Sequence, residues 1–108
     1  MASENKARGT RWERECADFL ALTVPGTDRV ALHGGLDHGD VHAGAWVLQC
    51  RNLKTLDLAG AVEDAKKQAV NAKKPYYAAV VKRRGKGVTR AYAVMELEQL
   101  AAVIGLVR

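Results

Sequence analysis

Residues 38–52 read HGDVHAGAWVLQCRN, and the fold expected for the whole chain follows from this stretch. The pair AG in its middle predicts a tight turn between two antiparallel strands, the second of which covers 45–51. Side chains alternate between the two faces of a strand, so Gln49 and Arg51 should share one face. An amide and a guanidinium would then lie together, close to the carboxylate of Asp40 on the neighbouring strand.

Other segments supply the elements that would surround this hairpin. Apolar residues recur at helical spacing after a T-x-x-E capping pattern at Thr10 and Glu13, which predicts a helix at 10–22. A second helix ends before Pro75 and should bury a face formed by Leu58, Val62, Ala69 and Val70. The full expected order is a helix at 10–22, strands at 29–32, 40–42 and 45–51, a helix at 58–72, strands at 76–82 and 89–94, and a last helix from about 97.

A helix lies between the strands at 45–51 and 76–82, so these two strands should be parallel and joined by a right-handed crossover. The expected class is therefore α/β, with a small mixed sheet flanked by helices and a C-terminal helix. At 108 residues the chain is long enough for one core, so we expect a single domain over 1–108.

The amino-acid composition limits the classes of protein to which the chain can belong. Hydrophobic residues make up 48% and charged residues 27%, as in ordinary globular domains. No apolar run approaches the roughly 20 residues that cross a bilayer, and the first ten residues lack the apolar segment of a secretory signal. Cys16 and Cys50 show no metal-binding spacing and are expected to be buried thiols, which suits a reducing cytoplasm.

The charge is distributed unevenly along the chain. Residues 51–90 contain 11 Lys and Arg against 3 acidic residues, whereas the whole chain has a net charge of only +5. A basic half beside an acidic remainder indicates a polyanionic partner that meets one face of the protein. A solvated basic surface without such a partner is the alternative.

The polar grouping in the hairpin can serve a divalent cation. The carboxylate of Asp40, the amide oxygen of Gln49 and the backbone carbonyl of Cys50 are the hard oxygen ligands that Mg²⁺ prefers. A cation beside the fixed charge of Arg51 would stabilise the charge that develops during phosphate hydrolysis. Polar pairs are also common on half-exposed strands, so the spacing alone leaves open a turn role for Asp40 and a surface role for the others.

Several short motifs occur along the chain in the same order as in a known protein family. GT-x-x-E-R-E at 9–15, VPG at 24–26, Asp40 at the start of a hairpin and Q-x-R at 49–51 resemble the archaeal-type Holliday junction resolvases of the PD-(D/E)xK nuclease superfamily. The stretch from RNLKTLDLAGAVEDA to KRRGKG is similar to resolvase-like endonucleases of actinobacterial phages. The resemblance covers roughly residues 8–100 and implies a restriction-endonuclease-like αβββαβ core.

The resemblance also implies roles for individual residues. Asp40 would be the principal metal ligand, and Glu13 matches a glutamate that such resolvases add to the metal site from their first helix. Gln49 stands where Glu or Asp is usual and would offer its amide oxygen. Arg51 replaces the usual lysine, and an arginine stays protonated and cannot act as a base. Glu13 has an alternative role as the partner of Thr10 in the helix cap.

The function expected from this resemblance is Mg²⁺- or Mn²⁺-dependent hydrolysis of DNA, with a four-way junction as substrate. The acting form would be a homodimer. It would act in the host cytoplasm if a phage encodes the chain. A catalytically weak or inactive DNA-binding module of the same fold, and a nuclease that acts on flaps or other DNA, are the alternatives. The residues expected to contact DNA phosphates are Arg29, Lys54, Lys66, Lys67, Lys82, Arg83, Arg84 and Lys86.

Three histidines near the hairpin, His33, His38 and His42, have spacings that match structural zinc sites poorly. A supporting role for His38 or His42 near a substrate phosphate stays open.

Overall fold

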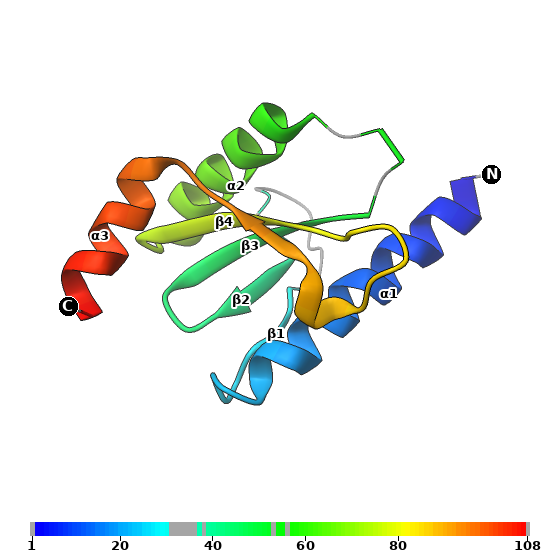
Figure 1. Ribbon diagram of the computed structural model, residues 1–108, viewed down its shortest axis with the longest axis horizontal. Coiled ribbons are helices and arrows are strands. Elements are labelled where there is room, and N and C mark those ends of the chain that lie inside the picture. Colours follow the sequence, from blue (N-terminus) through cyan, green and yellow to red (C-terminus); the bar gives the residue numbers. More distant parts are fainter. Residues whose placement is uncertain (1, 31–36, 38, 53, 56, 108) are drawn as a thin grey trace.

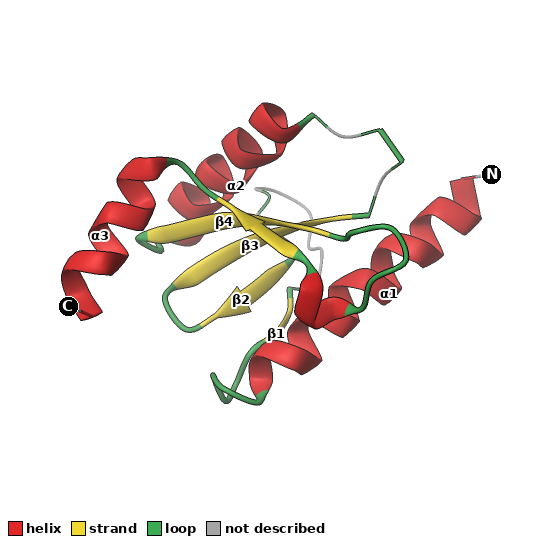
Figure 2. Ribbon diagram, in the orientation of Figure 1, coloured by secondary structure: helices red, strands yellow, loops and turns green. Residues whose placement is uncertain are grey.

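The computed structural model describes residues 2–30, 37, 39–52, 54–55 and 57–107. In this part of the chain, three α-helices and a five-stranded mixed sheet form a compact α/β fold (Figures 1 and 2). The elements in chain order are α1 (Ala2–Ala21), β1 (Asp28–Arg29), β2 (Val41–Ala43), β3 (Trp46–Arg51), α2 (Leu58–Ala72), β4 (Tyr76–Val81), the 3-10 helix η1 (Val88–Arg90), β5 (Tyr92–Val94) and α3 (Leu97–Val107).

The five strands are ordered β1-β2-β3-β4-β5 across the sheet. The first three form an antiparallel meander, β4 pairs parallel to β3, and β5 returns antiparallel to β4. The parallel pair predicted from the helical crossover is confirmed. The hairpin is confirmed too, with Ala43 opposite Trp46. Its two-residue loop begins at Gly44, whose φ of +56° suits the first loop position of a type II′ turn.

β3 divides the core into two halves, because its alternate side chains face opposite sides of the sheet. Leu48 and Cys50 pack with Trp12 and Cys16 of α1. Val47 packs on the opposite side, against small residues of α2. The two helices therefore cover opposite faces, and the predicted division of β3 is confirmed. Cys16 and Cys50 are both buried free thiols, as expected.

The second helix has the predicted bounds, Leu58–Ala72, because its ends are fixed locally. The side chain of Asp57 accepts a hydrogen bond from the N–H of Gly60 at 3.0 Å, which is an N-cap. Lys73 adopts a left-handed conformation at the C-cap. The predicted buried face was wrong in part, because Leu58 and Val70 are 48% and 72% exposed. The buried residues are instead Ala61, Val62, Ala65, Gln68 and Ala69.

The first helix begins at Ala2 rather than near Thr10, so the predicted capping box was wrong. Thr10 lies inside the helix, where a preceding turn already supplies backbone partners. β1 is shorter than predicted and ends at Arg29, and the expected positions 31 and 32 lie outside the described residues. The last strand starts at Tyr92, because η1 takes up the residues before it.

None of the helices in the described ranges is long and apolar enough to span a membrane.

Candidate active site

Asp40 stands at the entrance of β2, where backbone hydrogen bonds fix its position. Its N–H donates to the carbonyl of Leu48 at 3.2 Å, and its carbonyl accepts from Val30 at 2.9 Å. Gly39, just before it, has a φ of +99°, and a Cβ at this residue would collide with the side chain of Val47. Glycine is therefore required next to Asp40, by backbone conformation and by space.

The carboxylate of Asp40 is largely buried, with 23% of its side chain exposed. Its Oδ2 accepts a hydrogen bond from the backbone N–H of Cys50 at 2.8 Å. Burial, aided by the nearby negative charge of Glu13, raises the pKa of Asp40 to about 6, against the lowering effect of the Cys50 N–H and of Arg51. Asp40 therefore titrates close to neutral pH, which is unusual for an aspartate.

Arg51 lies at the centre of the site, where its guanidinium contacts four other residues. Its Nη2 lies 3.1 Å from Oδ2 of Asp64 on α2, and its Nη1 lies 3.7 Å from Oδ2 of Asp40. Nη1 also donates to the carbonyl of Cys50 at 3.5 Å, and the amide oxygen of Gln49 accepts from the same guanidinium. Oxygens from four residues thus converge on one cation.

Gln49 is 4% exposed, so its amide needs internal partners. We assign its oxygen to the side of Arg51 and its nitrogen to the side of Gln68 of α2, because only this orientation gives both amide atoms a suitable partner. Gln68 in turn donates to the carboxylate of Asp37 at 2.9 Å. This chain of contacts fixes which atom of Gln49 points toward Arg51, namely the oxygen.

Glu13 approaches the same region from α1, on the other side of the sheet. Its Oε1 pairs with Nε of Arg29 at 3.2 Å, and both side chains are mostly buried. Glu13 is close enough to influence the pKa of Asp40. Glu13 was expected to contact the metal and Arg29 to contact DNA. In the structure, the two side chains pair with each other instead.

The expected metal ligands can be tested against this geometry. No three His, Cys, Asp or Glu side chains among the described residues are grouped closely enough to hold an ion by themselves. The oxygens of Asp40, Gln49 and Cys50 nevertheless converge on one positively charged group, the guanidinium of Arg51. Such a donor set fits a hard divalent cation. A metal would take the place of Arg51, whose side chain would have to move aside.

A basic hollow of about 500 Å³ lies where β3 and β4 end, and none of the four residues that contact the guanidinium of Arg51 lines it. The N–H of Lys82 donates to the carbonyl of Arg51 at 3.0 Å, so the end of β4 is held next to the end of β3. Lys82 also lies over the ring of Trp12, 5.1 Å from its centroid, which is a cation–π contact. The residues that line the hollow are Arg8, Asn52, Lys54, Lys82, Arg84 and Gly85. Four cations around one concavity favour a phosphate-bearing ligand.

The other expected DNA contacts lie outside this hollow. Lys66 pairs with Glu96 at 3.5 Å, and Lys67 is exposed on α2. Arg83 stacks over the ring of Tyr92, 4.5 Å from its centroid, and Lys86 is exposed in the turn after β4. The structure therefore gathers three of the eight predicted residues, Lys54, Lys82 and Arg84, around one concavity.

Sequence reasoning missed Asp64, Gln68 and Arg8. Asp64 and Gln68 are four residues apart on α2, so they share a helix face, and this spacing opposite the Q-x-R strand was the available signal. Arg8 lies upstream of the predicted start of the first helix, so the misplaced helix start removed it from consideration. His33 and His38 lie outside the described residues, and His42 lies within β2.

Comparison of the chain with models of protein families, with curated proteins and with solved structures finds no match.

Proposed function

We propose that this protein is a metal-dependent DNA endonuclease with a PD-(D/E)xK-type core, and that it resolves Holliday junctions. The observation that carries the proposal is the convergence of Asp40, Gln49 and Arg51 near the end of β3, with a basic hollow at the same end of the sheet. A helix, a three-stranded antiparallel meander, a crossover helix and a parallel fourth strand agree with the αβββαβ core that the sequence resemblance implies.

In this proposal, some residues of the site would bind the metal and Arg51 would stabilise the phosphate. Asp40, the amide oxygen of Gln49 and the carbonyl of Cys50 would hold Mg²⁺ or Mn²⁺, with Glu13 near enough to add negative charge. The bound ion would polarise a phosphate oxygen and lower the pKa of a water molecule. Arg51 would turn from the carboxylates to the scissile phosphate, where a guanidinium stabilises charge without exchanging a proton.

DNA would be held by the basic hollow. Lys54, Lys82 and Arg84 offer charge to the backbone phosphates next to the cleaved bond, and such contacts position a duplex without reading its sequence. A four-way junction presents symmetry-related strands, so paired cleavage requires two sites and the acting form would be a homodimer.

A second candidate is a DNA-binding module that does not cleave. The contacts of Arg51 favour it, because the guanidinium engages the oxygens of Asp40, Gln49 and Cys50 at once. Gln49 also contributes one negative charge fewer than a glutamate would. In this case the basic hollow would still bind DNA, and Arg51 would serve as a fixed neutralising charge.

Cleavage of an end-labelled four-way junction, a flap and a linear duplex, in Mg²⁺ and in Mn²⁺, separates these functions. We expect paired nicks in the junction that vanish with chelator and in Asp40→Asn. Asp18→Asn is the matched control, since Asp18 is an exposed carboxylate on α1 paired only to Arg14 among the contacts described. Binding of the junction without cleavage would favour the second candidate, and cutting of the flap alone would indicate a different substrate.

A further inference from the structure

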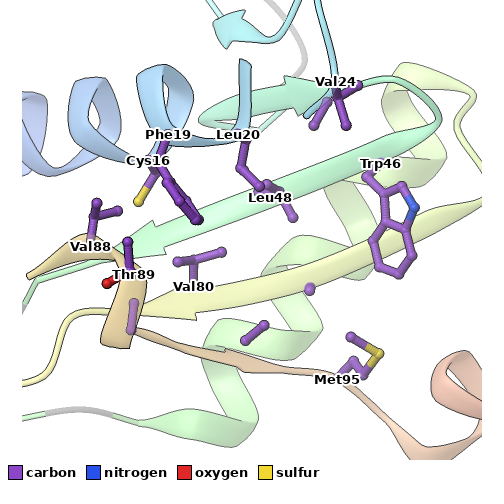
Figure 3. A pocket seen from close by; sticks show the side chains of 14 residues that line it. Cys16, Phe19, Leu20, Val24, Trp46, Leu48, Val80, Val88, Thr89 and Met95 are labelled. Atoms are coloured by element: carbon purple, nitrogen blue, oxygen red, sulfur yellow. The ribbon is translucent and has the colours of Figure 1, made fainter. Parts of the chain in front are cut away.

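One face of the sheet carries an open apolar groove of about 350 Å³. Figure 3 shows it between α1 on one side and η1 with β5 on the other, with strands β3 and β4 as its floor. The larger side chains that line it are Phe19, Leu20, Trp46, Val80, Val88 and Met95. α1 covers only part of this face, so the sheet residues beyond it remain open.

The C-terminal helix α3 is apolar and unburied. None of its eleven residues is buried, and Glu98 is its only charged residue. Leu97, Leu100, Ile104 and Val107 recur at helical spacing and are between 41% and 78% exposed. A stripe of this kind normally packs against another element, yet α3 makes few contacts with the rest of the described chain.

α3 is anchored in a position that keeps it out of its own groove. Gln99 in its first turn accepts a hydrogen bond from the N–H of Tyr77 at 2.9 Å and donates to the carbonyl of Pro75. Glu96, just before the helix, accepts from the hydroxyl of Tyr77. These bonds hold the start of α3 at the beginning of β4, and the helix then projects from that end of the sheet (Figure 1).

The groove and the helix belong to one continuous apolar surface. Ala91, Ala93 and Met95 line the groove, and along β5 they also border a second hollow that Leu100 of α3 closes. A single face therefore carries both an apolar ridge and an apolar depression. This combination is self-complementary, because a two-fold axis brings the ridge of each copy to the depression of the other.

We infer that a second copy of this chain occupies the groove, with α3 of each protomer inserted between α1 and β5 of its partner. An eleven-residue helix is about 16 Å long and 10 Å wide, so half of its lateral surface is roughly 250 Å². Two reciprocal contacts, with both helix and groove counted, bury on the order of 1,000 Å². That area belongs to the smaller class of interfaces, which associate weakly, so we expect a dimer that forms reversibly as the protein concentration rises.

The chemistry of the two surfaces excludes more polar occupants. The groove is lined by apolar side chains and the hydroxyl of Thr89, and the helix stripe carries no charge beyond Glu98. A nucleic acid would find no cation there. The basic hollow lies at the opposite end of β4, at Lys82, so dimerisation through α3 leaves it open.

The test is the mass of the protein in solution, measured by sedimentation equilibrium between about 1 and 100 μM, a range that brackets micromolar dissociation constants. The wild type should dimerise. Ile104→Glu on the helix and Ala93→Arg in the groove should each raise the dissociation constant by about 100-fold or more, since each places an unpaired charge in an apolar contact. Leu22→Glu is the control, because Leu22 is 82% exposed on a part of the chain outside the groove.

Mixing the two monomeric variants gives the sharpest outcome. In the mixed dimer, the glutamate introduced at position 104 of one protomer would face the arginine introduced at position 93 of its partner, and the second contact would be native. We expect the mixture to recover a dimer that neither variant forms alone, with circular dichroism showing that both are folded.

Three results would overturn the inference. The first is a wild type that stays monomeric at all concentrations, and the second is an Ile104→Glu variant that stays dimeric. The third is a folded pair of variants that fails to recover the dimer on mixing. No DNA is present in these measurements, so the result is independent of cleavage.

Discussion

The Nη1 atom of Arg51 lies 3.7 Å from Oδ2 of Asp40, so the residue that replaces the usual lysine rests against the residue expected to bind metal. The same guanidinium reaches Asp64 at 3.1 Å. It therefore contacts both the sheet and α2, through two different nitrogens of one planar group. Arg51 therefore occupies the oxygens that would bind a metal as long as no metal is bound.

Arg51→Lys should increase cleavage of the junction by about tenfold or more. A lysine releases the amide oxygen of Gln49 and the carbonyl of Cys50 for the metal, and it can orient or deprotonate an attacking water. The rate of single-turnover cleavage in Mg²⁺ checks this, and Mg²⁺ titration calorimetry should show tighter binding. Arg84→Lys, which keeps a cation in the basic hollow, should leave the rate nearly unchanged. A cleavage rate at or below that of the wild type would contradict the proposal that the side chain of Arg51 must move aside before the metal binds.

Asp40→Asn should stabilise the fold at pH 7. The pKa of Asp40 is raised to about 6 by burial, so its ionised form is disfavoured in the folded state. This destabilisation is present in full above pH 6 and disappears as the pH falls toward 4. The gain from Asn should reach at most about 3 kcal/mol at pH 7, at 1.4 kcal/mol per pKa unit, and vanish near pH 4.

Urea unfolding at pH 4, 5.5 and 7 measures this difference directly. Asp18→Asn is the control, because the side chain of Asp18 is 67% exposed on α1 and lies outside the site. A stability difference between wild type and Asp40→Asn that does not change with pH would show that the pKa of Asp40 is the same in the folded and unfolded chain.

The prediction of the fold worked best where local chemistry fixes an element. The stop at Pro75 placed the end of α2, and the helix between β3 and β4 indicated a parallel pair. The start of α2 is fixed by the cap at Asp57. The capping box at Thr10 failed for the converse reason. A cap pattern inside a helix-forming segment specifies a start only if the residues before it are poor helix formers, and here the helix extends back to Ala2.

The candidate site was predictable along one strand and not across elements. Alternation placed Gln49 and Arg51 on one face correctly. The contacts of Arg51 with Asp64, and of Gln49 with Gln68, depend on how α2 crosses β3, which no spacing within either segment reveals. The same crossing explains the misassigned face of α2, because Gln68 is buried by its partners although its residue type reads as polar.

Gly39→Ala should cost at least about 2 kcal/mol of unfolding free energy. The left-handed backbone penalises any Cβ by about 1–2 kcal/mol, and the collision with Val47 adds overpacking strain. Gly85→Ala separates the two effects, because Gly85 also has a positive φ of +70° but open space around it. Chemical denaturation of both variants measures the costs. Equal losses would mean that Val47 yields to the methyl group.

Arg84→Ala should weaken binding of the junction and lower the slope of log K against log salt concentration by about one. Lys66→Ala should change neither, because Lys66 pairs with Glu96 away from the basic hollow. Fluorescence anisotropy with a labelled junction in Ca²⁺, over a series of KCl concentrations, provides the comparison. Equal effects of the two variants would place DNA over a broader surface than the hollow.

The six-residue strand β4 has Tyr77 and the anchor of α3 near its start and Lys82 beyond its end. At about 3.3 Å per residue, this separates the two regions by roughly 20 Å. Substitutions that far apart and without shared partners combine additively in their free energies. The chain can therefore change how it associates with itself without changing how it holds a phosphate, and each property can evolve, or be engineered, on its own.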